Sequence, residues 1–183
     1  MDGKQLAHLH RQPLLIDHNS ATRLGGWYLI DQGRKRGMPI YYEIEKALIK
    51  TDQILSQITC DIPNPYVKLC NPQEIIEDPL RIFYGNPAWD LGSVINSLNN
   101  SVKTRVFLKQ YLDNQGVQVT IIELYTGILY AKLSDAIYTG CPKEWKYLAK
   151  GKCADIINGN RLCFDEITSE VLAGLGLPGL MRF

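Results

Sequence analysis

Three histidines and one aspartate near the start of the chain are residue types that bind metal ions. His8, His10 and His18 fall within eleven residues, and Asp17 adjoins the last of them. On an extended chain, His8 and His10 project to the same side. Neutral imidazoles and carboxylates are the ligands of open catalytic metal sites, so these four residues form a candidate metal site of a hydrolase or lyase. The alternative is a solvated arm whose histidines bind no metal.

Three consecutive cations form a second candidate site. Arg34, Lys35 and Arg36 lie between Gly33 and Gly37, which predicts a loop able to contact phosphate groups of a nucleic acid. The formal net charge of the whole chain is only +1, which favours a solvated turn over a nucleic-acid site.

Motifs for cofactors and covalent catalysis are missing from the sequence. It contains no glycine-rich dinucleotide or P-loop fingerprint, and no nucleophile-elbow serine. We therefore predict no cofactor and leave open whether the protein is an enzyme. Its five widely spaced cysteines include no C-x-x-C pair, which is typical of reduced thiols in a cytosol-like compartment.

The end of the chain is apolar but cannot be helical, because it is interrupted by three glycines and a proline. Leu177, Leu180, Met181 and Phe183 are its candidate interaction residues. Exposing such side chains together favours association, so we expect this tail to dock on another molecule. Packing against the rest of the same chain is the alternative.

The length of 183 residues suits a single globular domain, 1–183, which can bury a full core without disulfides or metals. The first twenty residues contain charges and no long apolar stretch, so we predict no secretory signal. No apolar run approaches the roughly 20 residues needed to span a bilayer. These features predict a soluble, intracellular, cytoplasmic protein.

Two predicted β-hairpins determine the expected fold. In residues 117–133, two runs rich in Val, Ile, Leu and Tyr meet at Thr126-Gly127, and in residues 154–164 two strand-like runs flank Asn158-Gly159. Residues 26–30 are also strand-like. Hairpins imply antiparallel pairing, so we expect an α+β fold with an antiparallel sheet covered on one face by helices.

Helical spacing of apolar residues predicts the covering helices. One is expected over 40–58, and a longer helical region over 90–112, broken near Asn99-Asn100-Ser101. Between them, residues 59–86 contain four prolines and form a predicted loop-rich excursion, with a short strand over 80–84.

The segment Gly37-Met38-Pro39-Ile40-Tyr41-Tyr42-Glu43, followed later by the predicted helix and hairpin over 106–133, resembles the bifunctional nuclease family. The order of the segments matches. The excursion would be an insertion, and the family's Arg-Pro-Ser-Asp-Ala-Ile helix would fall at the predicted Asn-Gly hairpin. The resemblance implies nuclease activity but carries over no catalytic residue.

The sequence thus favours a non-catalytic binding or assembly protein that self-associates or binds a protein partner. The first alternative is a nucleic-acid-binding protein or nuclease that uses Arg34, Lys35 and Arg36. The second is a metal-dependent hydrolase or lyase that uses the histidines.

Overall fold

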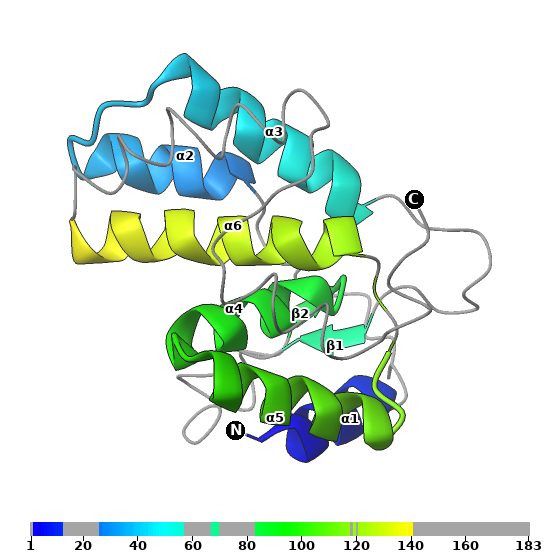
Figure 1. Cartoon of the computed structure of the whole chain (residues 1–183). Helices are drawn as coiled ribbons and strands as arrows, with labels where there is room; N and C mark the ends of the chain where they lie inside the picture. The colour runs from blue at the N-terminus through cyan, green and yellow to red at the C-terminus, as the bar shows by residue number, and fades with distance from the viewer. Residues whose placement is uncertain are drawn as a thin grey trace.

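Helices make up most of the described chain (Figure 1). The computed structural model describes residues 2–12, 26–56, 67–69, 83–117, 119 and 121–140. The helices are α1 (Gly3–Arg11), α2 (Gly26–Lys35), α3 (Tyr42–Ser56), α4 (Ala88–Leu98), α5 (Ser101–Asp113) and α6 (Ile121–Thr139). Strands β1 (Val67–Leu69) and β2 (Phe83–Gly85) form an antiparallel pair, the only strands among these residues.

The helices lie in layers on either side of α6. Helices α2 and α3 pack together and cover one side of α6, while α4 covers another side (Figure 1). Helix α1 packs on α5 and on β1, beyond α4. Among the described residues, no helix is both long and apolar enough to cross a membrane.

The expected α+β fold with an antiparallel sheet is wrong, because a single helix replaces the first predicted hairpin. Helix α6 runs through 121–139, and every residue from 124 to 131 is buried. A helix covered on several sides has no polar face, so its apolar run resembles a buried strand in the sequence. Residues 26–30 likewise begin α2 instead of forming a strand. The predicted hairpin over 154–164 lies outside the described residues.

Gly127 does not make a turn but allows α6 to touch α4. A Cβ atom on Gly127 would lie 2.0 Å from the Ala88 carbonyl oxygen, and one on Gly92 would lie 2.2 Å from the Gly127 carbonyl carbon. The two helices run in the same direction, because Asn86 bonds Glu123 near their starts and Asn96 bonds Asp135 near their ends. The two glycines therefore allow a backbone-to-backbone crossing between these polar links.

The type and approximate position of three other predicted elements are confirmed. The helix expected over 40–58 is α3, and the helical region expected over 90–112 is α4 and α5, separated at Asn99-Asn100 as predicted. Asn99 takes the left-handed conformation, and the Asn100 side chain accepts a hydrogen bond from the Lys103 backbone N–H. These asparagines end one helix and begin the next. The strand expected over 80–84 overlaps β2.

Candidate functional site

A buried polar cluster joins α1, α4 and α5. The His10 ring lies with Nε2 3.1 Å from Asp90 Oδ2 and Nδ1 2.8 Å from the Tyr111 hydroxyl. The side chains of His10 and Asp90 are 0% exposed, and Tyr111 is also buried. The Tyr111 hydroxyl in turn donates to the Val117 carbonyl oxygen at 3.2 Å. The cluster thus connects three helices and the segment that leads to α6.

The hydrogen bonds of this cluster form a chain from Asp90 to the Val117 backbone. A phenol has one proton, and Tyr111 gives it to the Val117 carbonyl, so its oxygen accepts from Nδ1–H of His10. The other ring nitrogen, Nε2, bonds Asp90 on α4, so His10 uses both of its nitrogens to join neighbouring helices.

Tyr111 stays a neutral phenol in this environment. Burial raises its pKa well above the ordinary value, the hydrogen bond with the Val117 backbone lowers it, and the charge of Asp90 raises it again. The protonated hydroxyl is the form that the donor bond to Val117 needs. Because the cluster is sealed and its polar atoms bond one another, its chemistry serves to hold helices together.

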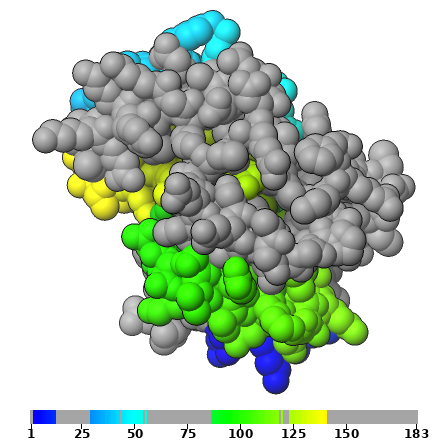
Figure 2. Space-filling model, viewed as in Figure 1, coloured from blue at the N-terminus to red at the C-terminus, as the bar shows by residue number. Residues whose placement is uncertain are grey.

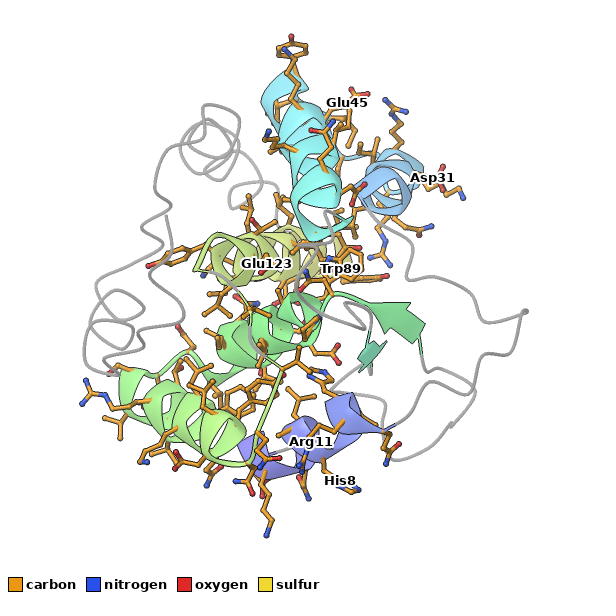
Figure 3. The ribbon with its side chains drawn as sticks, turned by 90° about the vertical axis from the view of Figure 1, so that its right-hand side faces the viewer. His8, Arg11, Asp31, Glu45, Trp89 and Glu123 are labelled. Carbon is orange, nitrogen blue, oxygen red and sulfur yellow. The ribbon has the colours of Figure 1, made fainter. Side chains whose placement is uncertain are left out.

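The structure separates the residues of the predicted metal site. Residues two apart on a helix point about 200° apart, so His10 faces the core from α1 while His8 is exposed on the outer side (Figure 3). Asp17 and His18 lie outside the described residues. Among the residues that are described, no group of three or more His, Cys, Asp or Glu side chains is placed to hold a metal ion.

The predicted loop that carries the phosphate-contacting cations is wrong for Arg34 and Lys35, which lie in the last turn of α2, and all three cations have a protein partner. Arg34 pairs with Glu45 at 3.8 Å and Lys35 with Asp31 at 2.6 Å. Figure 3 shows Asp31 and Glu45 on α2 and α3, at the same end of the molecule.

Arg36, the third of these cations, binds the last turn of α6. Its Nη1 donates to the carbonyl oxygens of Ile137 at 3.2 Å and Tyr138 at 3.1 Å, and its guanidinium lies 5.1 Å from the Tyr138 ring centroid. A cation at the carboxyl end of a helix satisfies free carbonyls and the negative end of the helix dipole. Arg36 therefore attaches the end of α2 to the end of α6.

The outer face of α5 carries two exposed valines. Val102 is 69% exposed and Val106 is 51% exposed, and they lie one turn apart on the side opposite to the buried residues of α5. Lys103 and Arg105 flank the valines, one on either side of this stripe, because the helix turns about 100° per residue. Lys109 continues the stripe and pairs with Asp113 at 2.7 Å. We call Val102, Lys103, Arg105, Val106 and Lys109 the α5 outer face.

Sequence reasoning missed both of these features. Asp90 and Tyr111 are 80 and 101 positions from His10, and no local motif links residues so far apart. Helical spacing counted Val102 and Val106 in the apolar repeat predicted over 90–112, whereas the structure exposes both valines. The candidate tail residues Leu177, Leu180, Met181 and Phe183 lie outside the described part of the chain.

Comparisons with known proteins give no relative. No protein-family model, no curated protein and no solved structure matches this chain. The resemblance to the bifunctional nuclease family also loses its hairpin, because α6 occupies that segment.

Proposed function

We propose that this protein is a non-catalytic binding protein whose binding surface includes the α5 outer face. The observation that carries the proposal is the exposure of Val102 and Val106, at 69% and 51%, next to each other on one helix. Burying a valine stabilises a complex or fold by roughly 1.5 kcal/mol or more. Adjacent exposed valines on a well-anchored helix are a surface that gains from being covered.

The inner face of α5 holds this surface rigidly. Thr104, Phe107, Leu108 and Tyr111 are all buried, and Tyr111 is also bonded to His10. At the start of the helix, the Asn100 side chain satisfies a free backbone N–H. A surface on a fixed element loses little conformational freedom on binding, which favours affinity.

The buried polar cluster and the Arg36 cap support the same proposal. His10, Asp90 and Tyr111 are used to join helices, and Arg36 is used to cap α6. The His10 cluster holds α5 against α1 and α4, and Arg36 joins α2 to α6. The polar groups of the scaffold thus serve to present a surface.

A site-specific cross-linking experiment tests the proposal. The protein would be produced with a photoreactive benzophenone side chain at Val106, and a matched protein would carry it at Tyr42, which is 65% exposed on α3. We expect a discrete adduct from position 106 that excess unlabelled protein competes away and that is absent from position 42. Light scattering then shows whether the adduct contains a second copy or another protein.

Two results would contradict the proposal. One is the absence of an adduct specific to position 106 at native protein concentration. The other concerns competition by excess unlabelled protein. If protein carrying Val102→Ser and Val106→Ser competes the adduct away as well as the unchanged protein does, the binding does not involve the valines.

A further inference from the structure

We infer that the α5 outer face binds an acidic amphipathic helix of a different protein, an inference that rests on the proposed function. The face has an apolar centre, Val102 and Val106, between Lys103 on one side and Arg105 on the other. A helix with apolar residues along one stripe and Glu or Asp beside that stripe is complementary to this arrangement.

The charges of α5 favour an acidic partner. The helix contains three cations and one carboxylate, and that carboxylate, Asp113, is already paired with Lys109. No described carboxylate pairs with Lys103 or Arg105, so both remain available to a partner. Cations at the rim of an interface steer an acidic partner and select its orientation.

The same charges disfavour a second copy of this chain on the face. A two-fold symmetric contact brings a surface against itself, so Lys103 and Arg105 would meet the same cations of the other copy. Like charges placed together in an interface reduce affinity. The partner is therefore a different protein.

The central position of the valines favours a protein partner over a nucleic acid. Phosphate backbones are bound by cations and polar groups, and a phosphate-binding helix gains nothing from two valines at the middle of its exposed side. A protein helix covers those valines with its own apolar side chains. The combination of an apolar centre and a basic rim thus favours a protein.

Binding of designed peptides tests the inference. The probe is a fluorescein-labelled helical peptide with Leu at the a and d heptad positions and Glu at e and g, measured by fluorescence anisotropy. One control peptide has Lys in place of Glu, and another has Ser in place of Leu. We expect the Leu/Glu peptide to bind and both control peptides to bind at least about tenfold more weakly.

Variants of the protein locate the site. We expect the pair Val102→Ser and Val106→Ser to weaken binding about tenfold or more, and the pair Lys103→Glu and Arg105→Glu to slow association and reduce its salt dependence. Tyr42→Ser is the matched control, because it removes an exposed apolar side chain on another helix, and it should change neither quantity. All these positions are exposed, so circular dichroism should show unchanged thermal unfolding.

Several outcomes would overturn the inference without affecting the proposed function. These are peptide binding that the α5 variants leave unchanged, equal binding of the Lys peptide, and valine-dependent binding of a generic oligonucleotide or of phosphatidylserine vesicles in place of the peptide. If the peptide fails to bind but a specific cross-link forms at Val106, the acidic helix is refuted as the partner and the proposed binding surface stands. Failure of both experiments removes the proposed function as well.

Discussion

Adding one methyl group at Gly127 should destabilise the protein more than almost any other single-carbon change in the described helices. In Gly127→Ala the new Cβ would lie 2.0 Å from the Ala88 carbonyl oxygen and 2.7 Å from the carbonyl carbon. Both are backbone atoms of α4, so no side-chain rotation relieves the overlap. The helices must move apart by about 1.4 Å, the difference between 2.0 Å and the 3.4 Å at which ordinary contact begins.

Two opposing effects determine the size of the change. Alanine is a better helix former than glycine by up to about 1 kcal/mol, which stabilises α6. Separation by more than 1 Å loses half or more of the dispersion energy between the facing side chains, and overpacking of this kind costs about 3 kcal/mol. The free energy of unfolding should therefore fall by about 2 kcal/mol or more.

Urea denaturation followed by circular dichroism measures this loss. For a denaturant slope of about 2 kcal/mol per M, the midpoint should fall by about 1 M. Ser97→Ala is the matched control, because it improves helix propensity at an exposed position of α4 without a clash. Gly92→Ala should also destabilise, since its Cβ would lie 2.2 Å from the Gly127 carbonyl carbon.

The double variant Gly92→Ala, Gly127→Ala tests whether α4 and α6 move apart as a unit. One separation of α4 from α6 relieves both overlaps, so the double variant should lose clearly less than the sum of the single losses. Fully additive losses would show that the helices do not move apart as a unit. A Gly127→Ala protein as stable as the unchanged one would refute the close crossing itself.

Three further predictions concern polar contacts. Tyr111→Phe should lower the free energy of unfolding by about 1–3 kcal/mol at neutral pH in urea titrations, because the hydroxyl contacts both His10 and the Val117 backbone. Burial raises the pKa of Tyr111 in the folded state, so above the ordinary value of 10.0 the unfolded chain releases a proton that the folded protein keeps. The free energy of unfolding should therefore fall as pH rises past that value, and it should fall less steeply in Tyr111→Phe. Arg36→Ala should lower the free energy of unfolding by about 1 kcal/mol, because it removes the cap of α6. Lys35→Ala breaks only an exposed ion pair and should change the free energy of unfolding by less than about 0.5 kcal/mol. Equal losses in the two variants would contradict the capping role of Arg36.

The sequence predicts helices that have two different faces. Helices α3 and α5 alternate buried and exposed residues at helical spacing, and Asn99 and Asn100 mark the end of α4 and the start of α5. Helix α6 could not be predicted this way, because its central residues 124–131 are all buried and include β-branched and aromatic types that favour strands. In that run, Gly127 looks like a turn residue, although its role is to allow contact with α4.

The buried cluster and the surface differ in how far the sequence reveals them. His10 is visible as a residue that can bind a metal or a proton, but its partners depend on how α1 packs against helices far along the chain. The expected pairing of His8 with His10 assumed an extended backbone, and the helical backbone of α1 separates them. The valines of α5 were counted in the predicted apolar repeat over 90–112, and their exposure follows only from which side of α5 packs on α1.

Docking of α1 on α5 has a consequence for the order of folding during synthesis. His10 and Tyr111 are 101 positions apart, so at translation rates of about 5–20 residues per second α1 waits about 5–20 s for its partner. During that time Leu6 and Ala7, which are fully buried in the folded protein, lack the helix that covers them. Docking of α1 must be a late, non-local step of folding, slowed by closure of a long chain segment. A substitution that weakens this docking would therefore prolong the exposure of α1 in newly made protein, and its first effect would be on the yield of folded chains.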